Sequence, residues 1–247
     1  MTEPVTVLIS SRNRPLYLWA CLDALYSFTR YPHRFVLLDL ASDDPMVENV
    51  IRGFERRRMF HEIVRAEQNH PSAVLDVLRQ NFSRWTPWFA YVESDALVHD
   101  TWPCWLTRLV SIMEKRPRMA MLGSAIDHRD FVDPEKVAHL RGDADEAHWR
   151  SLLKADSIER GQDLLSARGE EVFHPHNPAG RLLLLRTEAL QKMGLATDGA
   201  LDAMMRSAGY ETGIATRVRH RHLSLLHVYD YADYDIDGRN QYMSAPA

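Results

Sequence analysis

Short apolar runs alternate with longer amphipathic segments over the first half of the chain. Runs typical of buried strands are expected at 5–10, 35–39, 61–65, 88–93 and 119–123. Segments with apolar residues at helical spacing are expected to begin near Pro15, Pro45, Pro71 and Trp102. Strands that alternate with helices of this length predict an α/β fold, in which helices cover both faces of a mainly parallel central sheet.

Two loops carry local signals for helix starts. Asn13 is placed to cap the helix that begins at Pro15, because its side chain can accept a backbone N–H bond and proline suits a first helical turn. Asp44 and Pro45 form the same cap-plus-proline pattern for the next helix.

This alternation stops at about Asp127. Residues 127–178 are polar and rich in His, Asp, Glu and Arg, with one helical stretch near 147–165, so we expect an insertion that lies outside the sheet. Apolar order returns at 181–186. A further helix is expected from about Asp198 to Ala208, because Gly209 is a typical helix stop.

Composition narrows the class of protein. The chain has 247 residues, enough for one large domain or for a core domain with an appended lobe. Its formal net charge of −4 argues against a nucleic-acid partner. Its two cysteines, Cys21 and Cys104, lie in apolar helical patterns, so buried free thiols are expected.

The chain's setting is also an expectation from composition. Met1–Pro4 lead straight into a strand-like run, and no apolar stretch reaches the roughly 20 residues of a bilayer span, so we expect a cytoplasmic protein without a signal peptide. Peripheral membrane association is left open, and nothing in the pattern specifies an oligomeric state.

Polar side chains follow three of the predicted strands at the edge where ligands of open α/β sheets bind. They are Ser10, Arg12 and Arg14 after the first strand, Asp39, Ser42 and Asp43 after the second, and Glu93, Ser94 and Asp95 after the fourth. We expect them to converge on one edge of the sheet.

The triplet Glu93-Ser94-Asp95 carries two carboxylates on the same side of an extended segment. Such a pair can hold a hard divalent cation, Mn²⁺ or Mg²⁺, and leave positions for phosphate oxygens. Two solvated acids at a strand end are the alternative, and the buried strand before the triplet makes the metal interpretation as strong as this alternative.

Asp39 ends a buried strand, where a carboxylate can accept hydrogen bonds from a ribose or a base. Nicotinamide and S-adenosylmethionine sites share this feature, but residues 10–15 contain no glycine, which argues against a dinucleotide pyrophosphate at the loop. Arg12 or Arg14 could reach a phosphate instead, and a structural salt bridge is the alternative for each.

Five elements in order resemble the family 2 glycosyltransferases. Residues 5–15 look like the family's opening strand and loop, and 39–44 look like its Asp-x-x-Ser-x-Asp element. Glu93-Ser94-Asp95 stands where the family has its Asp-x-Asp metal motif. Residues 197–210 resemble its Glu-Asp helix, which ends in Gly-Tyr, and 219–222 resemble its late Val-x-His segment.

The resemblance implies a GT-A fold, a Rossmann-like nucleotide-diphospho-sugar transferase fold, in one domain over 1–247. It implies a nucleotide-binding half at 1–126, an insertion or acceptor-side lobe at 127–178 and an acceptor and catalytic half at 179–247. The implied activity is metal-assisted transfer of a sugar from a UDP- or GDP-linked donor to a carbohydrate or other hydroxyl acceptor, with inversion at the anomeric carbon.

The resemblance also implies roles for residues. Asp39 would bind the donor's base or ribose, Asp95 would bind the metal, and His220 or His222 would add a metal or phosphate contact. Asp198 would be the catalytic base, with Asp202 as the alternative base; an N-cap aspartate is the competing interpretation of Asp198.

Two departures from the family pattern keep other functions in view. Glu93 replaces the first aspartate of the metal motif, and Thr197 replaces the glutamate before the catalytic aspartate. A GT-A scaffold that binds nucleotide sugars without turnover is therefore one alternative. A nucleotidyltransferase is another, although the first loop lacks the glycines and lysine expected of that class.

Overall fold

The computed structural model describes residues 3–81, 86–127, 169–174, 181–194, 196 and 198–223. Within them, nine strands form one sheet in the order β3-β2-β1-β4-β8-β6-β9-β5, and β7 pairs with β9. The strands are β1 (Val5–Ser11), β2 (His33–Leu40), β3 (Phe60–Ala66), β4 (Trp88–Glu93), β5 (Ala96–Val98), β6 (Met119–Ile126), β7 (Val172–Phe173), β8 (Leu182–Arg186) and β9 (Glu211–His222). The helices are α1 (Pro15–Phe28), α2 (Pro45–Arg56), α3 (Pro71–Asn81), α4 (Trp105–Lys115), α7 (Thr187–Met193) and α8 (Asp198–Ser207).

The first half of the sheet is parallel. β1 pairs in parallel with β2 and β4, and β2 pairs in parallel with β3. β8 then lies antiparallel between β4 and β6, while β9 is parallel to β6 and antiparallel to β5. The predicted α/β fold with a mainly parallel central sheet is therefore confirmed.

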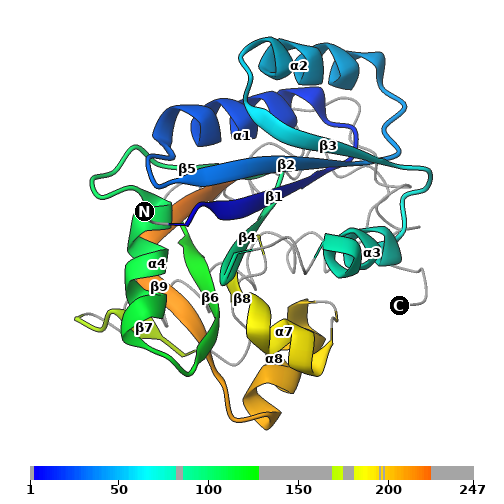
Figure 1. Ribbon diagram of the computed structural model, residues 1–247. Helices are drawn as coiled ribbons and strands as arrows, with labels where there is room; N and C mark the ends of the chain where they lie inside the picture. The colour runs from blue at the N-terminus through cyan, green and yellow to red at the C-terminus, as the bar shows by residue number, and fades with distance from the viewer. Residues whose placement is uncertain are drawn as a thin grey trace, which may run out of the picture.

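Helices cover both faces of this sheet (Figure 1). One apolar cluster joins the sheet to α1, α2 and α4, through residues such as Leu22, Ile51 and Leu109. A second cluster joins the other face to α3, α7 and α8, through residues such as Leu190 and Met205. Both cores bury strand residues on alternate sides, which explains why the strands read as near-continuous apolar runs.

Local chemistry explains the starts of α1 and α2. Pro15 is the first residue of α1, and the Asp44 carboxylate caps α2 by accepting a bond from the Met46 N–H at 2.8 Å. The prediction that Asn13 caps α1 is wrong: Arg14 occupies the cap position without a side-chain bond, and the Asn13 amide bonds to the loop before α2.

Two other boundaries differ from the sequence prediction. α4 begins at Trp105 rather than Trp102, because Cys104 is its cap residue. Val172–Phe173, inside the predicted insertion, pair with β9 and so belong to the sheet. Most of 127–178, including the expected helical stretch near 147–165, lies outside the described residues.

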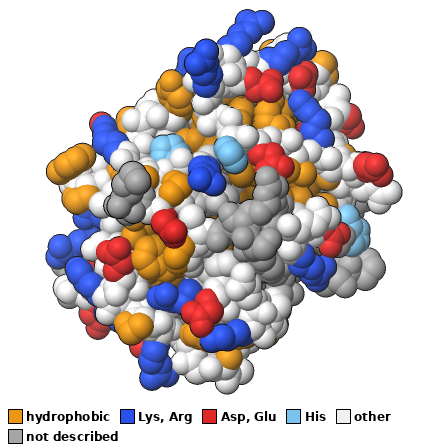
Figure 2. All heavy atoms as spheres, viewed as in Figure 1, with side chains coloured by type: hydrophobic (Ala, Val, Ile, Leu, Met, Phe, Trp, Pro, Cys, Tyr) orange, Lys and Arg blue, Asp and Glu red, His pale blue; other side chains and the backbone are white. Residues whose placement is uncertain are grey.

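Both cysteines are buried free thiols, as predicted. No helix among the described residues is long and apolar enough to cross a membrane. Figure 2 shows charged side chains of both signs over one face of the molecule, with several Lys and Arg side chains at the top, where Figure 1 places α2.

Candidate functional site

The predicted polar loops meet at the carboxyl ends of the parallel strands. The backbone N–H of Ser94, after β4, donates to the Ser10 carbonyl of β1 at 3.0 Å. The backbone N–H of Asn13 donates to Ser42 Oγ, after β2, at 2.8 Å. The prediction that these segments converge on one edge of the sheet is therefore confirmed.

Asn13 holds the first two loops together. Its Nδ2 donates to the Asp43 carboxylate at 2.9 Å, and its Oδ1 accepts from the backbone N–H groups of Asp43 and Asp44. Asn13 and Arg14 both have positive φ, a conformation that asparagine tolerates better than most residues. Ser42 and Asp43, predicted as donor-binding residues, thus serve as partners of Asn13 in the structure.

Asp39 is buried at the end of β2 and is held by two donors. The Ser42 N–H donates to Oδ1 and the Arg65 guanidinium donates to Oδ2, each at 3.3 Å. Arg65 also bonds to Glu48 at 2.7 Å. This pairing offsets the charge of the buried carboxylate and fixes its orientation at the carboxyl end of β2, next to β1.

The two carboxylates of the metal motif have different partners. Glu93 forms an ion pair with Arg181, which directly precedes β8. Asp95 is buried, and its Oδ2 lies 3.8 Å from Arg14 Nη1 and 3.7 Å from His222 Nδ1. Asp95 is therefore the acid that brings the first loop and β9 together.

Both predicted histidines point inward from β9. His220 and His222 are buried while Arg221 between them is partly exposed, as alternation in a strand requires, and the ring centroids of the two histidines lie 6.5 Å apart. His220 Nδ1 lies 2.7 Å from Ser124 Oγ. Burial and, to a smaller extent, the nearby His222 lower the pKa of His220 to about 3 against the opposing effect of Asp95, so the ring is neutral at neutral pH.

The donor set fits a divalent cation in part. A carboxylate and an imidazole within 4 Å, Asp95 and His222, are suitable ligands for Mn²⁺, and both side chains are held on paired segments, since His222 is opposite Ala96. No group of three or more His, Cys, Asp or Glu side chains within the described ranges is close enough to hold a metal. A cation bound there would need further ligands from phosphate oxygens and water.

The predicted catalytic helix is described only in part. The Asp202 side chain is buried, and its two oxygens accept from Arg206 Nε at 3.2 and 2.9 Å, so the alternative base already has an ionic partner. Asp198 begins α8, but its side chain and all of Thr197 lie outside the described residues.

Several residues that complete the edge were not predicted from the sequence. Arg65, Arg181 and Ser124 hold Asp39, Glu93 and His220, and Tyr91 OH lies 2.8 Å from Ser10 Oγ. Arg65 and Tyr91 belong to strands next to β2 and β1, so their positions in the predicted strands are the only signal the sequence offers. Arg12 lies half-buried in the same edge.

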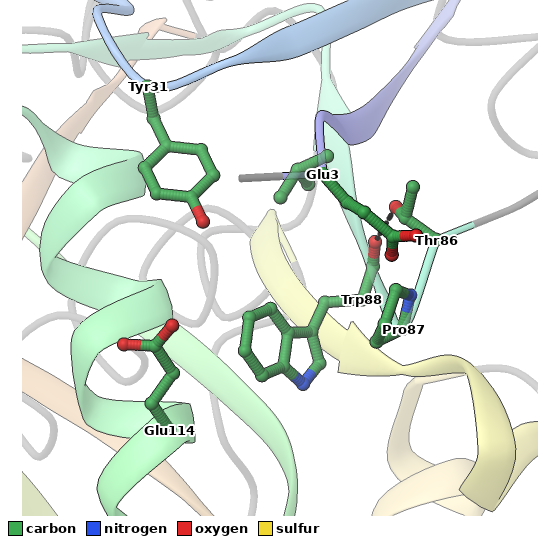
Figure 3. A pocket seen from close by; sticks show the side chains of 7 residues that line it. Glu3, Tyr31, Thr86, Pro87, Trp88 and Glu114 are labelled. Carbon is green, nitrogen blue, oxygen red and sulfur yellow. Dashed lines mark hydrogen bonds between the residues drawn. The ribbon is translucent and has the colours of Figure 1, made fainter. Parts of the chain in front are cut away.

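A pocket of about 190 Å³ lies at the other end of the sheet (Figure 3). Tyr31, Trp88 and Glu114 surround it together with Glu3, Val5, Thr86 and Pro87. Val5 and Trp88 are the first residues of β1 and β4, so this pocket opens at the amino ends of the parallel strands. It contains none of the predicted site residues.

Comparison with solved structures assigns the fold. One similar structure is the mannosyltransferase PcManGT from Pyrobaculum calidifontis in complex with GDP-Man and Mn²⁺. The match covers 98% of this chain and 63% of the mannosyltransferase chain at 17% sequence identity, with a TM-score of 0.61. A second is GalNAc-T7 with UDP, GalNAc and Mn²⁺, where the match covers 89% of this chain and 43% of the GalNAc-T7 chain at 13% identity, with a TM-score of 0.64. A third is S. aureus TarS 1-349, where the match covers 90% of this chain and 61% of the TarS chain at 14% identity, with a TM-score of 0.55.

These likenesses show that the chain has the GT-A fold. The chain spans between 43% and 63% of the length of these three structures. No family model and no curated protein matches the sequence. Membership of family 2 therefore stays a prediction from the ordered motifs.

Proposed function

We propose that this protein is a glycosyltransferase that moves a sugar from a UDP- or GDP-linked donor to a hydroxyl acceptor, with the help of Mn²⁺ or Mg²⁺. The observation that carries the proposal is the meeting of Asp95, His222 and Arg14 at the carboxyl edge of a GT-A sheet. Two similar structures support it, because their descriptions include GDP-Man with Mn²⁺ and UDP with GalNAc and Mn²⁺.

Asp39 would recognise the nucleoside. A buried carboxylate held by Arg65 and the Ser42 N–H is pre-oriented to accept bonds from a ribose hydroxyl or a base N–H. Ser10 and Ser94 line the adjoining loop ends, and the guanidinium groups of Arg12 and Arg14 can contact the diphosphate.

Asp95 and His222 would hold the divalent cation, with His220 as a neutral neighbour. When bound, the cation would offset the negative charge that develops on the departing nucleoside diphosphate. Glu93, paired with Arg181, would border this site rather than bind the cation directly.

Asp198 would take the proton of the acceptor hydroxyl. The hydroxyl oxygen then forms a bond to the anomeric carbon while the bond from that carbon to the diphosphate oxygen breaks, and its electron pair leaves with the diphosphate. Attack from the face opposite the leaving group inverts the anomeric configuration. The acceptor is a carbohydrate or another hydroxyl compound.

Isothermal titration calorimetry against UDP and GDP, with and without Mn²⁺, tests the donor site. We expect metal-dependent binding of one nucleotide, which Asp95→Ala abolishes. Asp100→Ala is the matched control, because Asp100 is exposed and pairs only with Arg30 among the described contacts. A folded protein that binds neither nucleotide under any metal condition would overturn the proposal.

A nucleotide-sugar-binding module without turnover is the second candidate. The pairing of Glu93 with Arg181 favours it, because it leaves Asp95 as the one motif carboxylate beside His222. Donor hydrolysis separates the two functions: a transferase releases UDP or GDP slowly from its sugar donor, whereas the module binds the donor and returns it intact.

A further inference from the structure

Helix α1 is apolar on both sides. Among residues 15–28 only Asp23 is charged. One side packs into the core, yet the other side exposes Leu16, Trp19 and Tyr26 to 66%, 49% and 45%. A helix that is apolar all round is normally covered on all sides, so the outer side of α1 has the composition of a contact surface.

The neighbouring helix extends this surface and adds positive charge. α2 packs against α1 and exposes Met46. Residues 52–58, at its end, contain four arginines and one glutamate, and all five of these side chains are exposed. Arg57 lies 5.7 Å from the centroid of the Tyr26 ring and 3.3 Å from Asp23, so the basic cluster adjoins the apolar side of α1.

The picture of the surface agrees with this arrangement. Lys and Arg side chains stand together at the top of Figure 2, over the α2 layer of Figure 1, with acidic side chains between them. The chain as a whole has a net charge of −4, so the positive charge here is a local feature.

We propose that this α1–α2 face, defined by Leu16, Trp19, Tyr26, Met46 and arginines 52 and 56–58, binds the surface of an anionic phospholipid bilayer. Tryptophan and tyrosine are the side chains that favour the bilayer interface, and arginines beside them attract acidic headgroups. A second copy of the chain is a poorer occupant, because both copies of the face would carry the same excess of positive charge and would repel each other.

The position of α1 gives this contact a consequence. α1 begins at the residue after Arg14, so the same segment carries a predicted phosphate contact and the exposed Leu16 and Trp19. A protein docked through α1 would hold the carboxyl edge of its sheet, with the proposed donor site, close to the headgroup layer, where an acceptor embedded in or attached to the membrane is presented. The docking itself does not depend on the proposed sugar transfer.

Vesicle flotation with the full chain tests the contact. We expect binding to phosphatidylcholine vesicles that contain 30% phosphatidylglycerol, weaker binding at 0.5 M salt and little binding to phosphatidylcholine alone. Arg56→Gln and Arg58→Gln should each weaken binding about fivefold. Trp19→Ala should weaken it several-fold at both salt concentrations, because its contribution is apolar.

Matched controls lie on the opposite face of the sheet. Arg79→Gln on α3 and Met204→Ala on α8 change an exposed arginine and an exposed methionine and should leave vesicle binding unchanged. Circular dichroism confirms that each variant is folded. Failure of the wild type to bind anionic vesicles, or equal losses in the control variants, would overturn the proposal. So would a dimer, seen by light scattering, that Trp19→Ala dissociates in the absence of vesicle binding.

Discussion

The Asp95 carboxylate is shared between a histidine on a strand and an arginine on a loop. Arg14 Nη1 and His222 Nδ1 approach the same oxygen, at 3.8 and 3.7 Å. A guanidinium there supplies positive charge that a divalent cation would also supply, so the two compete for Asp95. We expect Arg14→Gln to bind Mn²⁺ alone on the order of tenfold more tightly, equivalent to ~1.4 kcal/mol, as measured by calorimetry without nucleotide.

The same substitution should act in the opposite direction once nucleotide is added. If Arg14 moves to the diphosphate when a metal takes its place, Arg14→Gln will bind UDP or GDP with Mn²⁺ more weakly than the wild type. Arg30→Gln serves as the control, because Arg30 pairs with Asp100 on the surface. Weaker Mn²⁺ binding by Arg14→Gln would mean that Arg14 orders Asp95 rather than competing with the cation.

His220 predicts a pH dependence of stability. Its pKa is about 3 in the folded protein and near 6.5 in the unfolded chain, so between these values only the unfolded chain binds the proton. The free energy of unfolding should therefore fall as the pH is lowered from 6.5 towards 3, by at most ~1.4 kcal/mol per pH unit from this group. Urea unfolding of the metal-free protein measures this slope.

His220→Gln removes the titrating ring and should flatten that slope. Its overall stability will also change, so the comparison is between slopes and not between absolute values. His61→Gln, at an exposed position of β3, should keep the wild-type slope. An unchanged slope in His220→Gln would show that other groups cause the acid sensitivity.

At the scale of elements, the sequence predicts the strands and helix starts that depend only on neighbouring residues. Apolar runs predict the strands from β1 to β6, apart from the short β5. Residues such as Asp44 and Pro45, whose chemistry acts within a few positions, predict the starts of α1 and α2. Asn13 was misassigned because its partners, the Ser42–Asp44 loop, lie about 30 residues away. β9 alternates exposed Arg217 and Arg219 with buried Val218, the alternation of a strand, although no apolar run marks a strand at these positions.

The β7–β9 contact makes a prediction about glycine. A Cβ on Gly213 would lie 2.6 Å from Val172 Cγ1 and 2.8 Å from the Phe173 carbonyl oxygen, and the backbone atom cannot move aside cheaply. Gly213→Ala should therefore lower the free energy of unfolding by about 1–3 kcal/mol. Gly53→Ala, where a Cβ in α2 would meet nothing within 4 Å, should raise it by up to ~1 kcal/mol.

Urea unfolding of the two alanine variants gives the result directly. The pair is informative because both add one methyl group to an ordered element, and only the surroundings differ. A stable Gly213→Ala variant would indicate that β7 does not lie against β9 in solution.

At the scale of the whole molecule, local sequence patterns say little about which strands pair and which side chains meet. β8 pairs with β4 residues that lie 90 to 98 positions earlier and with β6 residues that lie 60 to 64 positions earlier. The ion pair of Glu93 with Arg181 follows from the β4–β8 pairing. The ordered motifs predicted Asp39, Asp95 and His222, because each resembles a family element in its own short stretch. Their partners Arg65 and Arg14 depend on which strands and loops adjoin, which periodicity does not specify.

The carboxyl edge of the sheet unites segments from both ends of the described chain, and the proposed binding of ligands there predicts how they stabilise the fold. Arg14, Asp95 and His222 meet only in the folded protein, so a ligand that contacts all three stabilises the folded state by mass action. Mn²⁺ with UDP or GDP should therefore raise Tm by several degrees, more than the sum of the shifts with each alone, since ~1 kcal/mol corresponds to about 2–4 °C for a domain of this size. In Asp95→Ala the increment that requires Mn²⁺ should vanish, while any shift from nucleotide alone should persist through Asp39. Equal Mn²⁺-dependent Tm shifts in the wild type and in Asp95→Ala would mean that the metal binds elsewhere and that Asp95 is not part of the donor site.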